Sequence, residues 1–363
     1  MSWFWVFVGF CLLILLHEAG HYAAAKATGM RVERFFLFFG PTIWSFKRGE
    51  TEYGVKAIPI GGYVKITGMN PEEDVPPEVA HRAYYRQKVW KRIVVVAAGP
   101  AVNIVLAFAI LFGVYWANGR EEIQQTVGET RSAPASKVLR PGDEIVAVDG
   151  HRYADLSTEE RLVKFSETVG SHKCEGKQVD GCVAETPVRL QVRRDGELKT
   201  ITVYPRYDSE VKRALVGFSY GSVNHPIGAG TAAKEAGDAI WEVASGTVHV
   251  FTHLFESEQR KQVSGVVGIS DVGHQVIEKG LERALLLLAF VSLSLGLVNL
   301  LPILPLDGGH IFWSLVEKVR GRPVSLRVME RATMVGIALV LMLFFLGLSN
   351  DIGRITGEGF EVR

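Results

Sequence analysis

One motif and its surroundings constrain this chain more than any other feature. An uninterrupted apolar run, Trp3 to Leu16, leads directly into the sequence HEAGH at 17–21. On a helix, His17 and His21 lie one turn apart on the same face, where both imidazoles can bind one Zn²⁺ ion while Glu18 serves as a general base. Ionisable groups are costly in lipid and are usually functional where they occur there. The sequence therefore predicts a zinc site inside a membrane; the alternative is a pair of histidines that only form hydrogen bonds in a helix bundle.

The apolar run does not read as a removable signal peptide, because no basic segment precedes it and no small-residue cleavage site follows it. A helix starting at Trp3 places His17 roughly 21 Å along its axis, within a hydrocarbon core about 30 Å thick. Three further segments are long and apolar enough to cross a bilayer: about Ile93–Trp116, Ala284–Leu304 and Ala332–Leu348. The composition, 48% hydrophobic and 22% charged, fits a membrane protein that also carries a soluble part.

Basic residues predict the topology. The connection between the first two spans, 28–92, contains eleven Lys and Arg, and the connection after the third span contains Lys318, Arg320, Arg322, Arg327 and Arg331. The positive-inside rule makes both connections cytoplasmic, so that both termini and the long insert lie on the opposite side. The two histidines then lie toward the cytoplasmic face. A net charge of +1 gives no indication of a nucleic-acid partner.

The third span ends in NLLPILPLDGGH, residues 299–310. Pro302 and Pro305 cannot continue helical hydrogen bonding, so we expect the chain to unwind there, which a membrane tolerates only where the backbone is buried in protein or lines a wet cavity. Because this span runs inward, Asp307 reaches the depth of the histidines and is the candidate third ligand. Two histidines and a carboxylate leave a fourth position for water. The alternative is that Asp307 only caps a helix or starts the cytoplasmic loop.

These motifs resemble those of the site-2 protease family of intramembrane zinc metalloproteases, in its bacterial RseP type. Three segments appear in family order: HEAGH at 17–21, GPAVNIVLA at 99–107 and NLLPILPLDGGH at 299–310. The resemblance implies a general base, Glu18, and a set of zinc ligands comprising His17, His21 and Asp307. It also implies that Asn299 and Asn103 contact substrate; hydrogen bonding between helices is the alternative for both.

A β-hairpin is expected in the first cytoplasmic connection. Residues 42–66 read as short alternating strands with a turn at 48–50. In the family, the matching region is a β-hairpin that enters the membrane, and an exposed edge there could pair with an extended substrate by β-augmentation. A plain cytoplasmic hairpin is the alternative.

The insert resembles a single PDZ domain at 120–208, through the segment 132–153 and through closing strands joined at Asp195-Gly196, a strong hairpin-turn signal. The RseP type often carries a tandem pair, so this chain departs from it. A PDZ groove would either bind a C-terminus left by a first cleavage or exclude bulky ectodomains.

The remaining features of the sequence are three cysteines and a linker. Cys174 and Cys182 of the insert would form a disulfide in an oxidising compartment, whereas Cys11 has no expected partner. The linker, 209–283, contains an amphipathic helix within 226–256 that we expect at the outer membrane surface.

The predicted fold is a polytopic α-helical membrane protein with four transmembrane helices, a membrane-associated β-hairpin and an inserted extracytoplasmic PDZ domain of the α+β class. Its membrane core comprises 1–119 and 284–363, around the PDZ domain at 120–208 and the linker at 209–283. The resemblance implies an intramembrane zinc protease of the bacterial cytoplasmic (inner) membrane.

Its expected substrates are single-span membrane proteins such as anti-sigma factors, cut after an upstream site-1 protease, together with leftover signal peptides. The alternative function is a catalytically silent PDZ membrane scaffold with a structural zinc. The intact Glu18 argues against that alternative, because a structural site needs no general base and is usually closed by a fourth protein ligand.

Overall fold

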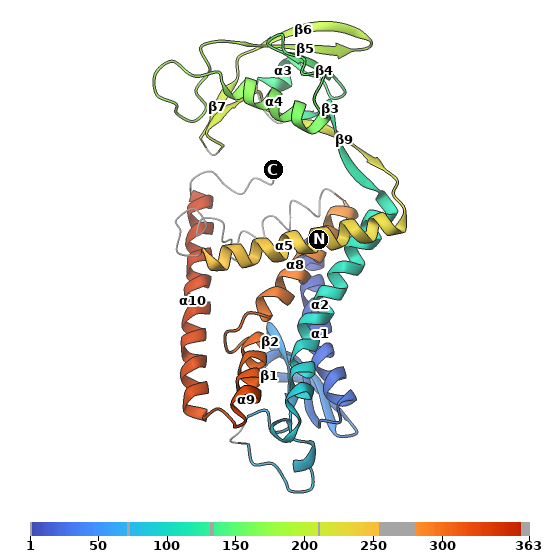
Figure 1. Cartoon of the computed structure of the whole chain (residues 1–363), viewed down its shortest axis with the longest axis vertical. Helices are drawn as coiled ribbons and strands as arrows, with labels where there is room; N and C mark the ends of the chain where they lie inside the picture. Colours follow the sequence, from blue (N-terminus) through green and yellow to red (C-terminus); the bar gives the residue numbers. More distant parts are fainter. Residues whose placement is uncertain (1, 71–72, 131–133, 210, 254–279, 357–363) are drawn as a thin grey trace. The chain divides into compact units, whose positions relative to one another are not determined.

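The computed structural model describes residues 2–70, 73–130, 134–209, 211–253 and 280–356 of the 363-residue chain. The chain forms two compact units: unit 1 comprises Met1–Trp116 with Gly228–Arg363, and unit 2 comprises Ala117–Ile227. Figure 1 follows the helices and strands along the chain. Each unit is described by itself below.

Unit 1 is built on long apolar helices. The described part of the chain contains four helices that are long and apolar enough to cross a membrane: α1 (Ser2–Ala27), α2 (Val89–Asn118), α8 (Leu281–Asn299) and α10 (Leu326–Thr356). Helices α2 and α8 pack through small and branched side chains, including Ala107, Leu111, Ala289 and Leu293. Many large apolar side chains on the outer faces stay exposed, as expected where lipid is the solvent.

The third apolar segment is interrupted where its prolines predict. Helix α8 ends at Asn299, short of the predicted Leu304, and a new helix, α9 (Asp307–Arg320), begins after a non-helical stretch at 300–306. Gly308 and Gly309 follow Asp307 directly. A side chain would not fit at position 309, because a Cβ atom there would lie 2.5 Å from the backbone N of Leu304. The loop therefore folds back tightly over the first turn of α9.

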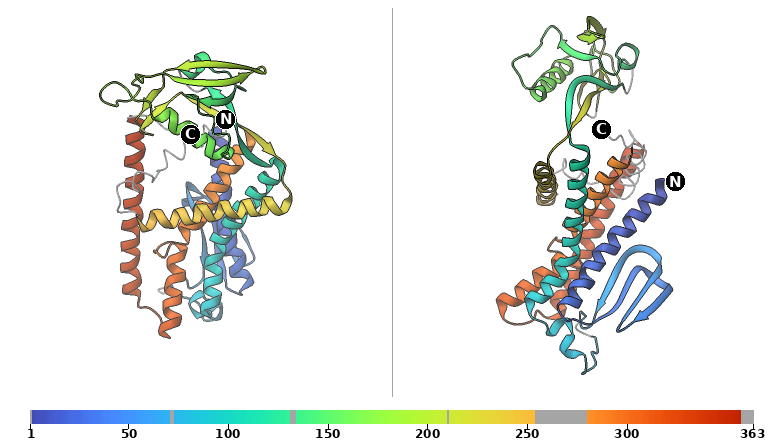
Figure 2. Two further views of the ribbon diagram at one scale, coloured as in Figure 1. Left: turned by 45° about the horizontal axis from the view of Figure 1, so that its top comes forward. Right: turned by 90° about the vertical axis from the view of Figure 1, so that its right-hand side faces the viewer.

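The hairpin of unit 1 is longer than predicted. Strands β1 (Val32–Arg48) and β2 (Thr51–Ile66) form an antiparallel sheet around the predicted turn, so the hairpin begins at 32 rather than 42. Phe35 pairs with both Val64 and Tyr53, which means that the first half of β1 lies between the two ends of β2. The result is a narrow sheet that curls back on itself (Figure 2, right, blue).

Helix α5 (Ala229–Thr252) confirms the helix expected in the linker. It runs across the direction of α2 and α8 (Figures 1 and 2) and buries Ala232 and Ala236, with Ile240 and Val243 packed against the cluster of α2 and α8. The end of the predicted segment, 254–256, lies outside the described residues.

Unit 2 contains a five-stranded sheet with the order β6-β5-β4-β3-β9. Its elements are β3 (Arg120–Thr130), α3 (Ala135–Val138), β4 (Glu144–Val148), α4 (Thr158–Gly170), β5 (Val188–Arg194), β6 (Glu197–Val203), the small pair β7 (Arg206–Asp208) and β8 (Arg213–Leu215), and β9 (Phe218–His225). The core includes Phe165 of α4 packed against strand residues such as Ile145 and Leu190.

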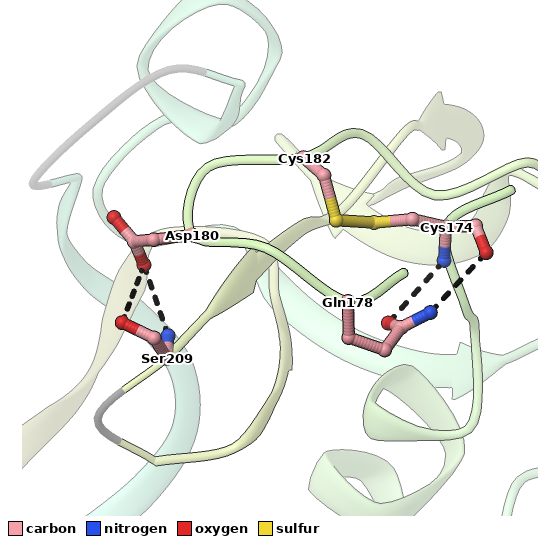
Figure 3. The surroundings of a disulfide bond; sticks show 5 residues. All are labelled: Cys174, Gln178, Asp180, Cys182 and Ser209. Carbon is pink, nitrogen blue, oxygen red and sulfur yellow. Dashed lines mark hydrogen bonds between the residues drawn. A yellow bond between two sulfur atoms is a disulfide. The ribbon is translucent and has the colours of Figure 1, made fainter. Parts of the chain in front are cut away.

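Two local predictions for unit 2 are confirmed. Asp195 and Gly196, both with positive φ, form the turn between β5 and β6, and Cys174 is joined to Cys182 by a disulfide (Figure 3). The unit extends to Ile227, beyond the predicted boundary at 208, because β9 pairs with β3 and completes the sheet.

Candidate metal centre

The two motif histidines lie together near the end of α1. Their Nε2 atoms are 3.3 Å apart, and His17 is buried. Nδ1 of His21 donates a hydrogen bond to the carbonyl oxygen of Val95 on α2 at 2.9 Å. A proton held on Nδ1 leaves the Nε2 lone pair of His21 free for a metal ion, which is the usual arrangement for a metal-binding histidine.

Asp307 completes the group from the opposite end of the chain. Its Oδ2 atom lies 3.2 Å from Nε2 of His17 and 3.3 Å from Nε2 of His21. Asp307 is the first residue of α9, but the N-cap position is Leu306 and no side chain caps the helix. The carboxylate is therefore directed at the imidazoles and not at the helix end. We call His17, His21 and Asp307 the ligand cluster.

The spacing of the ligand cluster suits zinc. Bonds of about 2.0 to 2.1 Å at tetrahedral angles separate ligand atoms by roughly 3.3 Å. The three separations in the structure are 3.3, 3.2 and 3.3 Å. Within the described part of the chain, these are the residues that form a cluster able to hold a metal ion. Two histidines and one carboxylate leave one tetrahedral position for water or substrate.

Two glycines allow the helices to approach at this point. A Cβ atom on Gly20 would lie 2.6 Å from the carbonyl oxygen of Ala98, and one on Gly99 would lie 2.9 Å from Nε2 of His17 and closer still to His21. Glycine is therefore needed at 99 for the imidazoles to lie against the backbone of α2. Sequence reasoning missed this role, although a Gly-Pro pair inside an apolar span was a signal of close helix packing.

The ligand cluster lines a cavity of about 310 Å³. Glu18 and Asn299 also lie in its wall, together with the β2 segment from Gly61 to Val64. A Cβ atom on Gly62 would lie 2.9 Å from Cγ of Glu18, so the strand passes directly beside the carboxylate. The cavity thus contains a candidate metal site, a candidate base and the edge of a strand.

Asn103 is not among the residues that line this cavity. It is fully buried, and neither Nδ2 nor Oδ1 has a hydrogen-bond partner among the described residues. Its backbone carbonyl accepts a hydrogen bond from Oγ of Ser292 on α8 at 2.9 Å. The structure therefore brings Asn299 to the ligand cluster and places Asn103 in the contact between α2 and α8.

Comparison with known proteins supplies an independent finding. The model of Peptidase family M50 matches residues 5–343. The zinc metalloprotease Rip1 of Mycolicibacterium smegmatis is 33% identical over 356 residues, covering 88% of this chain and 86% of its own. The zinc metalloprotease Rip1 of Mycobacterium tuberculosis is 32% identical over 390 residues, covering 93% of this chain and 94% of its own.

Proposed function

Because the chain belongs to Peptidase family M50 and is an intramembrane zinc metalloprotease, we propose that the ligand cluster holds its zinc ion and that Glu18 is its general base. The observation that carries this assignment is the spacing of the three ligand atoms, which matches a tetrahedral site in the same cavity as Glu18.

Each group has a defined task in peptide hydrolysis. Glu18 takes a proton from the attacking water and passes it to the leaving amine, so no covalent intermediate with the protein is required. A zinc ion held by the ligand cluster would polarise the scissile carbonyl and make water a better nucleophile. The bond from His21 to Val95 keeps its imidazole in the orientation that the metal needs.

The substrate class imposes a structural demand. A transmembrane helix uses its backbone carbonyls in its own hydrogen bonds, so a substrate must unwind before hydrolysis. The β2 segment at 61–64 lies in the cavity wall and supports β-augmentation, in which an extended substrate strand pairs with this edge. We propose that Asn299 contacts the substrate backbone there. We propose the same role for Asn103, whose buried side-chain amide has no hydrogen-bond partner among the described residues.

We further propose the bacterial cytoplasmic (inner) membrane as the location, with the basic connections inside. In unit 1 the α1–α2 and α9–α10 connections lie at the same end of the helices, which agrees with a cytoplasmic position for both (Figures 1 and 2). The proposed substrates are single-span proteins such as anti-sigma factors, trimmed first by a site-1 protease.

We propose that unit 2 is a PDZ domain. Its β9 lies at one edge of the sheet, where a peptide could add a strand. The experiment measures the binding of two peptides to the full chain, one with a free and one with an amidated C-terminus. It decides whether unit 2 binds a C-terminus or excludes large ectodomains.

Two variants test the proposed site in detergent-purified protein. Glu18→Gln should retain zinc and lose cleavage of a single-span substrate, because it removes the base and leaves the ligands. Asp307→Ala should lose zinc and cleavage together, since two histidines alone hold zinc poorly. The scaffold alternative predicts that Glu18→Gln changes nothing. Full zinc content in Asp307→Ala would assign the third ligand elsewhere.

A further inference from the structure

An ion pair between a buried arginine and a partly buried glutamate joins α2 to α9 away from the cavity. Nη2 of Arg92 lies 2.7 Å from Oε1 of Glu317, and Arg92 is only 7% exposed. The guanidinium carbon is 5.7 Å from the ring centre of Tyr84, and Nε of Arg92 has no partner among the described residues. Glu317 is the anionic partner of Arg92 among the described residues, and a buried guanidinium depends strongly on such a partner.

Glu317 lies on the helix that begins with Asp307. The two residues are ten positions apart, which places them roughly 15 Å apart along the axis of α9. Between them, Ser314 is buried and Ile311 packs against the apolar cluster that contains Tyr84, Val95 and Val96. One face of α9 is therefore docked along much of its length, from the carboxylate ligand to the ion pair.

The same stretch of α2 also positions the histidines. Arg92, Val95 and Gly99 have the spacing i, i+3, i+7 and so share one face of α2. Val95 accepts the hydrogen bond from His21, and Gly99 lies against both imidazoles. Two turns of α2 thus contact the elements that present all three members of the ligand cluster.

The chain before Asp307 cannot hold α9 in place through helical continuity. Residues 300–306 are not helical, so the resistance of α9 to rotation and sliding relative to α8 comes from its side-chain contacts and the tight loop, and not from continuous helical hydrogen bonds. The ligands of a metal site must be held within roughly 0.5 Å of their working positions, so a shift of Asp307 by about 1 Å would already weaken metal binding. A fixed point at the far end of α9 would prevent both movements.

We propose that Arg92 and Glu317 are a positioning pair that fixes the height and rotation of α9 and thereby sets the carboxylate of Asp307 against His17 and His21. This inference rests on the proposed role of Asp307 as a zinc ligand. It predicts that the pair controls zinc affinity although neither side chain belongs to the ligand cluster.

Zinc retention by the full chain in detergent is the test, measured against a graded zinc chelator. Arg92→Gln should weaken zinc binding by about tenfold or more, the scale of outer-shell effects in metal sites. Arg92→Lys should weaken it less, because lysine keeps the positive charge that faces Glu317. Glu317→Gln removes the anionic partner of Arg92 and should weaken zinc binding as well, so it decides the matter if Arg92→Gln does not elute as folded protein.

A matched control separates positioning from stability. Arg194→Gln breaks a comparable buried pair with Asp143 in unit 2 and should lower stability without changing zinc affinity. Wild-type zinc affinity in folded Arg92→Gln and Glu317→Gln would overturn the inference. If Asp307→Ala also retains zinc, the proposed ligand set itself fails; if Asp307→Ala loses zinc, only the positioning role fails.

Discussion

Gly99 of α2 lies against the imidazole of His21, and a Cβ atom at position 99 would stand 2.6 Å from Cε1 of that ring. The contact joins the motif of the first apolar helix to the Gly-Pro pair of the second. No side chain can be placed between them without moving a ligand. The two helices therefore form one site, and the packing of their backbones is a condition for metal binding.

Gly99→Ala should accordingly weaken zinc binding and reduce turnover, because the methyl group occupies space that the His21 imidazole now fills. The matched control is Gly113→Ala on the same helix, where a Cβ atom would meet nothing within 4 Å. The control should retain zinc and be slightly more stable, since alanine is the better helix former by about 1 kcal/mol. Metal content and thermal unfolding, measured for both variants, check this prediction. Equal zinc content in the two would contradict it.

Much of the site was predictable because its determinants are local. The periodicity of a helix brings His17 and His21 together, and the prolines at 302 and 305 predict the break before Asp307. The start of β1 at Val32 was missed, because its aromatic-rich first half does not alternate between apolar and polar residues. The contact of Arg92 with Glu317 could not be predicted, since only tertiary packing brings those helices together.

The proposed topology makes a labelling prediction. After replacement of the native cysteines, a single cysteine at Arg48 should resist a membrane-impermeant reagent added to intact cells, whereas one at Asp195 should react. The positive-inside rule gives the reason, since residues 28–92 carry eleven Lys and Arg. Permeabilised cells, in which both positions should react, provide the control. Labelling at position 48 in intact cells would invert the topology.

Unit 2 should lose stability in acid through Asp143. Nε and Nη2 of Arg194 donate to its two carboxylate oxygens at 2.7 and 2.6 Å, and these bonds hold the pKa of Asp143 below its usual value in spite of burial. Because the folded-state pKa lies below the unfolded one, the stabilisation is fully present above about pH 4 and is lost as the pH falls through the folded value.

Asp143→Asn should therefore cost roughly 3 kcal/mol at pH 7 and less at pH 3, since pH 3 lies below the unfolded pKa. Hydrogen-exchange protection of β4 and β5 in the full chain measures the difference. A cost that does not change between the two pH values would assign the loss to packing and not to charge.

The disulfide between Cys174 and Cys182 should stabilise unit 2 without being required for folding. A loop of 8 residues is closed, for which the chain-entropy model gives a contribution of about 2.5 kcal/mol. The loop has other restraints: Nε2 of Gln178 donates to the carbonyl oxygen of Cys174, and Asp180 accepts from Ser209 (Figure 3). These contacts should keep the loop in place after both cysteines are replaced by serine. Hydrogen-exchange protection of unit 2 should fall, because the disulfide no longer constrains the unfolded chain, but the sheet should persist. Peptide mapping without reductant tests the bond itself, and recovery of both cysteines in alkylated form from natively expressed protein would refute it.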